Sequence, residues 1–271
     1  MTKFHLAIHR MKFFYCAIFL SLSLFSKAQS YSAFETHYFD TKLLNLPYRY
    51  LRPAAVENEH SYPLVIFLHG AGHKGRDNQM QLQVGASLFL ADSNRKRFPA
   101  YVLFPQCPVV DVWTYFESYT DSRTGKERMA FPLRKSATEV MSTLITLIDS
   151  LVRADAIDNK RIYVIGLSQG GMGVLEMASR YPQLITAGVS MCGAGNFKLA
   201  KNFSPQLSLW LFHGSRDDVI DVSWSRGFYK KSKDRIADVR YNEYEGLAHD
   251  CWTRALQEPG LLRWLFSKVK N

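Results

Sequence analysis

The sequence predicts an α/β fold, with a mostly parallel central sheet and helices on both of its faces. Short apolar runs rich in β-branched and aromatic residues alternate along the chain with segments of helical spacing. Most of these runs are continuously apolar, as expected of strands that are covered on both faces. The 271 residues contain no internal repeat and are enough for one sizeable core.

Seven runs are predicted to be strands, at residues 48–51, 64–68, 101–104, 162–165, 187–191, 209–212 and 239–244. Helical spacing recurs over residues 140–151 and 174–178, and a last helix is expected over 259–269, beginning at a proline. In a parallel sheet of this kind the ligand lies beyond the carboxyl ends of the strands. Functional residues are therefore expected in the loops that follow the strands.

The N-terminus is predicted to be a secretory signal peptide. Lys12 precedes an apolar run at 13–25, and small residues occupy the −3 and −1 positions of a cleavage site after Ala28. The run is short for a membrane span. We expect a signal peptide over 1–28 and a single domain over 29–271, periplasmic or secreted and without stable membrane insertion after cleavage. An uncut N-terminal anchor is the alternative.

The distribution of charge argues against a nucleic acid partner. The formal net charge is +10, and removal of residues 1–28, which hold four basic residues and no acidic one, would leave +6. The remaining basic residues are scattered, with only short clusters such as Arg95-Lys96-Arg97. A nucleic-acid-binding domain more often concentrates them on one element.

A serine on a glycine-rich turn is the strongest candidate for chemistry. In Gly166-Leu-Ser168-Gln-Gly170 a predicted strand ends at Gly166 and a helix begins near Gly170. The G-x-S-x-G pattern in this context is typical of a nucleophile elbow, where side chains at the glycine positions would collide with the adjoining strand and helix. The sequence therefore predicts Ser168 as a nucleophile, with the helix dipole favouring negative charge beside it.

A serine nucleophile needs a base that takes its proton. After a nucleophile elbow, the acid and then the histidine follow along the chain. Two histidines follow Ser168. His213 ends a predicted strand and comes too early, whereas His249 lies in the loop after the last predicted strand. His249 is therefore predicted as the general base.

The acid that orients the histidine is expected after the strand at 209–212. Asp217 and Asp218 both stand there, and their spacing does not separate them. Asp221 and Asp250 are weaker candidates, because turn or cap roles explain them more simply.

Two backbone N–H groups are expected to hold the oxyanion. One belongs to Gln169, which follows the nucleophile, and the other to Ala71, in the glycine-rich loop after the strand at 64–68. His69 and His73 are four residues apart in that loop and not on a helix face, so a zinc site is disfavoured. We expect no metal and no cofactor, and a structural role for His69.

The segment 105–132 has no clear periodicity and carries Trp113, Tyr115, Phe116 and Tyr119. Loops of this length in compact domains are functional or disordered, and the aromatic residues argue against disorder. The segment is therefore predicted to be a substrate-facing flap with Trp113 as a substrate contact, and surface packing is the alternative.

Three cysteines, Cys107, Cys192 and Cys251, would remain after cleavage. An odd number in an oxidising compartment permits at most one bridge, and the sequence does not choose the pair. Cys251 lies two residues after His249, so a Cys192–Cys251 bridge is one candidate.

Five motifs together resemble one family: His69-Gly-Ala-Gly, Phe104-Pro-Gln-Cys-Pro, Gly166-Leu-Ser-Gln-Gly, His213-Gly-Ser-Arg-Asp217 and His249-Asp-Cys-Trp252. They are similar to α/β-hydrolase esterases of the phospholipase/carboxylesterase and polyhydroxybutyrate-depolymerase-like group, which includes exported feruloyl and acetyl-xylan esterases. The resemblance covers residues 46–269. It implies an α/β-hydrolase fold and an esterase that uses a Ser-His-Asp triad on a small-molecule or polysaccharide-linked ester, with acyl or feruloyl esters on carbohydrate favoured.

The resemblance also selects residues. It favours Asp217 over Asp218, because the family's acid stands four residues after the histidine of its His-Gly strand end; the prolines that usually follow that acid are missing here. It also suggests Trp252 as a substrate-binding residue, with packing beneath the histidine loop as the alternative. A serine peptidase of the same fold is the alternative activity. A non-catalytic glycan- or protein-binding module is disfavoured, because all three triad positions hold a suitable residue.

Overall fold

The computed structural model describes residues 30–271 apart from 43, 58 and 126. The predicted signal peptide lies outside the described residues, so that interpretation stays a prediction. Residues Tyr31–Asn271 form one compact unit. Within the described part of the chain, no helix combines the length and apolar character needed to span a bilayer.

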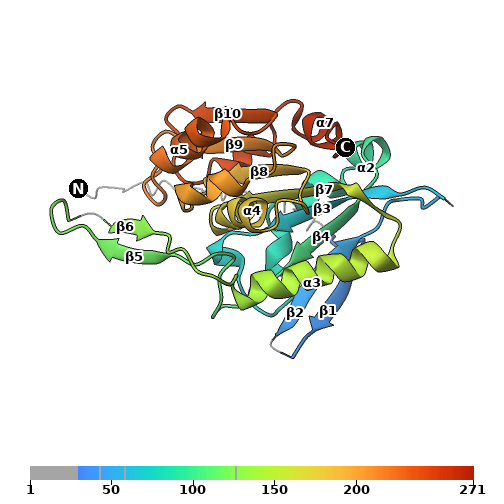
Figure 1. Ribbon diagram of the computed structural model, residues 1–271. Helices are drawn as coiled ribbons and strands as arrows, with labels where there is room; N and C mark the ends of the chain where they lie inside the picture. The colour runs from blue at the N-terminus through green and yellow to red at the C-terminus, as the bar shows by residue number, and fades with distance from the viewer. Residues whose placement is uncertain (1–29, 43, 58, 126) are drawn as a thin grey trace, which may run out of the picture. The chain divides into compact units, whose positions relative to one another are not determined.

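A mixed sheet of eight strands forms the centre of this unit in the described residues (Figure 1). Its strands, in spatial order, are β1 (Glu35–Asp40), β2 (Asn45–Leu51), β4 (Tyr101–Pro105), β3 (Tyr62–Leu68), β7 (Ile157–Leu167), β8 (Ala187–Met191), β9 (Ser208–Gly214) and β10 (Asp238–Tyr244). β1 and β2 pair antiparallel, as do β2 and β4, and the pairs from β4 to β10 are parallel. The predicted α/β class is confirmed, and all seven predicted strands are present.

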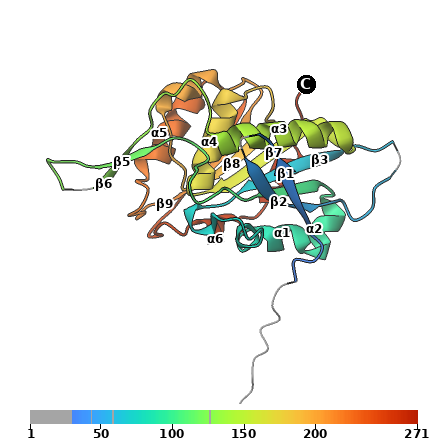
Figure 2. The ribbon, with the colours of Figure 1, turned by 90° about the horizontal axis from the view of Figure 1, so that it is seen from below.

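Helices cover both faces of the sheet (Figure 2). Helices α3 (Glu139–Ala154), α4 (Gln169–Arg180) and α5 (Ser223–Ser232) pack on one face, and α1 (Ala86–Leu90), α2 (Asp92–Arg97), α6 (Trp252–Ala255) and α7 (Leu261–Phe266) on the other. Alternate side chains of β3 divide between the two cores: Leu64 and Ile66 join the first, and Val65 and Phe67 the second. This division explains why the strand is apolar throughout.

The last helix is shorter than expected. It covers Leu261–Phe266 and not 259–269. Gly260 before it has a left-handed backbone with φ of 89°, so the helix begins after this residue. The segment predicted to be a flap contains a small antiparallel hairpin, β5 (Glu117–Thr120) and β6 (Glu127–Ala130), which projects away from the central sheet (Figure 1).

Candidate active site

Ser168 occupies a strained turn between β7 and α4. Its backbone has φ of 53° and ψ of −119°, a conformation that residues other than glycine rarely adopt. The Ser168 N–H is held by the Met191 carbonyl at 2.8 Å. A Cβ on Gly166 would lie 2.2 Å from the Gly170 carbonyl oxygen, and one on Gly170 would lie 2.0 Å from the Leu68 carbonyl oxygen. The turn therefore requires both glycines, as the sequence predicts.

His249 faces Ser168 from the loop after β10. Its Nε2 lies 2.9 Å from Ser168 Oγ, and its Nδ1 lies 2.8 Å from Asp217 Oδ2. Because the carboxylate can only accept, Nδ1 carries the proton and Nε2 is left to accept from the serine hydroxyl. His249 is partly exposed, with 19% of its side chain accessible, and the side chain of Asp217 is fully covered. The structure thus brings the three predicted residues into one hydrogen-bonded chain.

Asp217 accepts hydrogen bonds on both carboxylate oxygens. Oδ1 accepts from the backbone N–H groups of Val219, at 3.0 Å, and Ile220, at 2.8 Å. Burial acts to raise the pKa of Asp217, but hydrogen bonds from His213, His249 and the Ile220 N–H outweigh burial and hold that pKa well below its usual value. Asp217 is therefore ionised at neutral pH. The other three acidic candidates are exposed and stand outside this arrangement: Asp218, Asp221 and Asp250.

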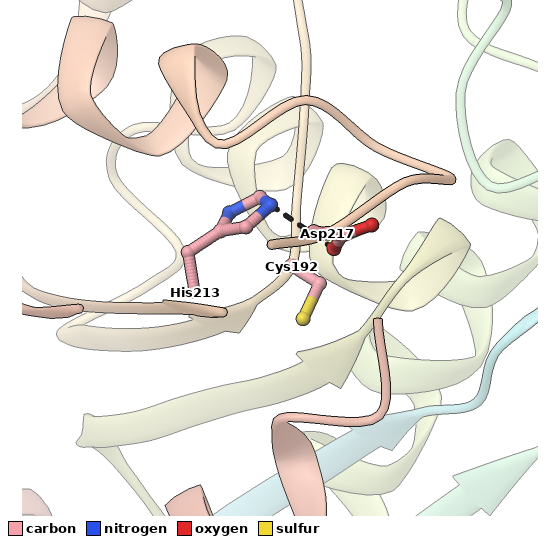
Figure 3. A group of neighbouring side chains, drawn as sticks. All are labelled: Cys192, His213 and Asp217. Atoms are coloured by element: carbon pink, nitrogen blue, oxygen red, sulfur yellow. Dashed lines mark ion pairs between the residues drawn. The ribbon is translucent and has the colours of Figure 1, made fainter. Parts of the chain in front are cut away.

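His213 is a residue of this site that the sequence analysis rejected as the base and gave no other role. It is fully buried, and its Nε2 lies 2.8 Å from the Ile220 carbonyl and 3.2 Å from Asp217 Oδ2 (Figure 3). Both partners are acceptors, so Nε2 carries a proton, and Nδ1 is left to accept from the Ser225 hydroxyl at 2.7 Å. Asp217 is therefore fixed by two imidazoles. The signal for His213 was its place at a buried strand end, four residues before the acid.

The two predicted oxyanion donors each begin a helical turn. Gln169 is the first residue of α4, and Ala71 is the first residue of a 3₁₀ turn over Ala71–His73. The N–H groups at the start of a helix have no acceptor within it. A Cβ on Gly70 would lie 3.5 Å from the Ser168 Cβ, so the Ala71 loop runs close beside Ser168. The oxyanion role of the two N–H groups stays a prediction.

His69 holds that loop. Its Nε2 accepts from the Cys107 N–H at 2.9 Å, so Nδ1 carries the proton that it donates to the Gly70 carbonyl at 2.7 Å. Burial lowers the pKa of His69 to about 4, so the ring is neutral at pH 7. With its one lone pair already accepting from Cys107, His69 positions the loop, in line with the structural role expected for it.

The expectation that Trp113 contacts substrate is wrong. Its side chain is 0% exposed and belongs to the core. Its indole N–H donates to the His69 carbonyl at 3.1 Å, and the two rings pack at 5.4 Å between centroids. Trp113 therefore supports the Ala71 loop from the core, through its contacts with His69.

Trp252 is partly exposed, and its ring stands edge-on to His249 with centroids 5.2 Å apart. Its role in substrate binding stays a prediction. A cleft of about 630 Å³ lies beside Asp217, between the β5–β6 hairpin and the segment 217–224. Tyr119, Arg128 and Trp224 line this cleft, and Tyr119 is 52% exposed. The exposed aromatic side chains of this segment are thus Tyr115 and Tyr119 and not Trp113.

The fold and this arrangement define a class. A mostly parallel sheet with a serine on the elbow after β7, an aspartate after β9 and a histidine after β10 is the α/β-hydrolase fold with a serine–histidine–aspartate constellation. A sequence model of the Phospholipase/Carboxylesterase family matches residues 54–259, and the chain belongs to that family.

Comparisons with individual proteins agree with this assignment. The chain is 32% identical over 101 residues to the bifunctional acetylxylan esterase/xylanase XynS20E of Neocallimastix patriciarum, a match that covers 35% of this chain and 15% of that protein. It is similar to a thermostable esterase of known structure, with 30% identity and a TM-score of 0.78 over 88% of this chain and 64% of that one. A ferulic acid esterase, at 14% identity and a TM-score of 0.63 over 86% and 98% of the two chains, shares the fold. The chain thus spans less than two thirds of the first two proteins.

Proposed function

We propose that the protein is an exported serine esterase that hydrolyses carboxylic esters through an acyl-enzyme. The observation that carries this proposal is the hydrogen-bonded chain from Asp217 through His249 to Ser168, with donor–acceptor distances of 2.8 and 2.9 Å. Membership of the Phospholipase/Carboxylesterase family supports ester hydrolysis as the activity.

Each residue has a defined step in this mechanism. His249 Nε2 takes the hydroxyl proton as Ser168 Oγ attacks the ester carbonyl carbon, and Asp217 stabilises the imidazolium that forms. The N–H groups of Gln169 and Ala71 donate to the oxyanion, and each such donor is worth about 3–4 kcal/mol in the transition state. His249 then protonates the leaving alkoxide. Water, deprotonated by the same nitrogen, attacks the acyl-serine, releases the acid and restores the serine.

We propose an acyl or feruloyl ester carried by a carbohydrate as the substrate. The cleft beside Asp217 supports this class, because it combines charged and hydroxyl groups with the half-exposed ring of Tyr119. A sugar presents hydroxyl groups and an apolar face, which such a lining complements. The acetylxylan esterase relative agrees with a polysaccharide-linked ester.

Export rests on the signal-like sequence of residues 1–28. Expression of the full chain in a Gram-negative host, followed by fractionation and N-terminal sequencing, tests it. A periplasmic or secreted product that begins at Gln29 is expected, and a cytoplasmic product that begins at Met1 would contradict it.

The mechanism is tested with a fluorophosphonate probe and p-nitrophenyl acetate. We expect one adduct, on Ser168, and loss of both labelling and turnover in Ser168→Ala. Ser87→Ala is the matched control, because Ser87 is an exposed serine on α1. Labelling elsewhere, or turnover retained in Ser168→Ala, would refute the nucleophile. Comparison of feruloyl, acetylated-sugar and peptide substrates then separates the proposed esterase from a peptidase.

A further inference from the structure

Two buried cysteines face each other beside the candidate site. Cys192 directly follows β8, and Cys251 directly precedes α6, two residues after His249. Both are thiols here, with Sγ atoms 2.6 Å apart. Unbonded carbon atoms, which are smaller than sulfur, rest about 3.5–4.0 Å apart, and the S–S bond of a disulfide is about 2.05 Å long. The separation therefore suits a bonded pair better than two thiols in contact.

The backbone aims Cys192 at its neighbour. Its φ of 51° lies in the left-handed region, which is uncommon for residues other than glycine and persists where the surrounding structure enforces it. The Cys192 N–H donates to the Phe212 carbonyl at 2.8 Å, and its thiol lies 3.1 Å from the His249 carbonyl. The direction of the Cys192 side chain is thus set by the strand ends around it.

A metal site is the competing interpretation, because Cys192, His213 and Asp217 hold possible ligand atoms within 4.8 Å of one another (Figure 3). However, His213 Nε2 carries a proton between two acceptors, and Asp217 Oδ2 accepts from His249. The neighbouring Cys251 thiol and burial raise the pKa of Cys192, which disfavours the thiolate that a metal needs. The three residues therefore do not fit a metal, and the partner of Cys192 is Cys251.

We propose that Cys192 and Cys251 form a disulfide that ties the His249 loop to the strand end beside Ser168. The two thiols lose two protons and two electrons to the disulfide of a thiol–disulfide oxidoreductase, which becomes a dithiol as the new S–S bond forms. Because both sulfur atoms are buried, the exchange takes place before the His249 loop docks. Cys107 stays a thiol, since it lies in the other core, against the His69 loop.

The bridge would join the two segments between which the proton is proposed to move, the one that holds Ser168 and the one that holds His249. The Met191 carbonyl holds the Ser168 N–H at 2.8 Å, and Cys192 is the next residue along the chain. A bond from Cys192 to Cys251 therefore keeps His249 against the serine as temperature rises. The bridged residues are 59 positions apart, and closing so long a loop strongly restricts the unfolded chain. The effect on activity rests on the proposed role of His249, whereas the linkage itself does not.

Peptide mapping tests the linkage without reference to activity. The full chain is refolded from denaturant in mixtures of oxidised and reduced glutathione, free thiols are alkylated, and the digest is analysed by mass spectrometry. We expect a peptide that links Cys192 to Cys251, with Cys107 and Cys16 alkylated. Alkylation of both Cys192 and Cys251 at every glutathione ratio, or a bridge to Cys107, would overturn the proposal.

Thermal unfolding separates a bond from mere packing. Cys192→Ala, Cys251→Ala and the double variant should each lower the melting temperature by a similar amount, roughly 5–15 °C, because each removes the same bond. Refolding with reductant should lower the melting temperature of the wild type to that of the variants, and should leave the melting temperatures of the Cys192 and Cys251 variants unchanged. Cys107→Ala should respond to reductant as the wild type does. Additive losses together with a wild type insensitive to reductant would show packing alone. If the linkage and the melting temperatures are as expected but the protein shows no esterase activity, the disulfide proposal stands and the proposed function is overturned.

Discussion

The choice of Asp217 over its neighbour Asp218 is open to a direct test by Asp217→Asn and Asp218→Asn. All four groups that bond Asp217 are donors: two imidazole N–H groups on Oδ2 and two backbone N–H groups on Oδ1. An asparagine has one accepting oxygen, so its NH₂ must face donors on one side. If the NH₂ faces His249, Nδ1 must accept, and Nε2 then carries a proton toward Ser168 and cannot act as the base.

We expect Asp217→Asn to lower kcat on p-nitrophenyl acetate by about 10⁴-fold, the size of loss seen when a triad aspartate becomes asparagine. At about 1.36 kcal/mol for each factor of ten, that is about 5.4 kcal/mol of transition-state stabilisation. Asp218→Asn is the matched control, because it removes the same formal charge from the adjacent exposed residue. Its kcat should stay within about twofold of the wild type, as surface substitutions usually have small effects.

The assay is steady-state hydrolysis at neutral pH, with the fluorophosphonate labelling rate as a second measure. Circular dichroism and melting temperature establish that each variant is folded. A folded Asp217→Asn protein that keeps more than about a tenth of the wild-type kcat, or a large loss in Asp218→Asn alone, would refute the reasoning about this carboxylate.

Three further predictions follow from the geometry. Gly170→Ala should lower the melting temperature by at least about 6 °C, because its Cβ would lie 2.0 Å from the Leu68 carbonyl oxygen. The Cβ of Gly72→Ala meets nothing within 4 Å, so this control should leave the melting temperature unchanged. Equal melting temperatures of the two variants would contradict this reasoning. The pKa of Asp217 is lowered in the folded state, so its ionised form stabilises the fold above about pH 4, and this contribution is lost as the pH falls further. Urea unfolding from pH 7 to pH 3 should therefore show the stability gap between wild type and Asp217→Asn narrowing, and a constant gap would count against the linkage. Tyr119→Ala should raise KM for acetylated xylo-oligosaccharides about fivefold and leave p-nitrophenyl acetate unaffected; an unchanged KM would remove the cleft from the substrate path.

The strands were predictable where burial on both faces makes the sequence itself apolar. β8 matches its expected range residue for residue, and the expected strand at 209–212 lies inside β9. β1 was missed, because this edge strand is largely exposed and its residues, Glu35–Asp40, are mostly polar. Local pattern thus reports how a strand is covered, and an uncovered strand leaves little pattern to detect.

Trp113 shows the limit of reasoning from a single segment. Its position in a stretch without periodicity is equally compatible with a surface flap and with a buried support. The contact that decides between them is the hydrogen bond to the His69 carbonyl, 44 residues earlier in the chain. In the same way, the bond that singles out Asp217 comes from His249, 32 residues later. Such choices depend on contacts that only the folded chain creates.

The sequence could predict at which edge of the sheet the site lies. Ala71 follows β3, Ser168 follows β7, Asp217 follows β9 and His249 follows β10. Because these strands are parallel, all four loops lie at the same edge, and each needs only to be short and correctly directed to meet the others. The direction in which the loops leave β7 and β8 is set by backbone strain. Ser168 and Cys192 follow these adjacent strands, and both have positive φ. The Ser168 N–H bonds the Met191 carbonyl between them, so the two strained turns support each other and fix where the serine points.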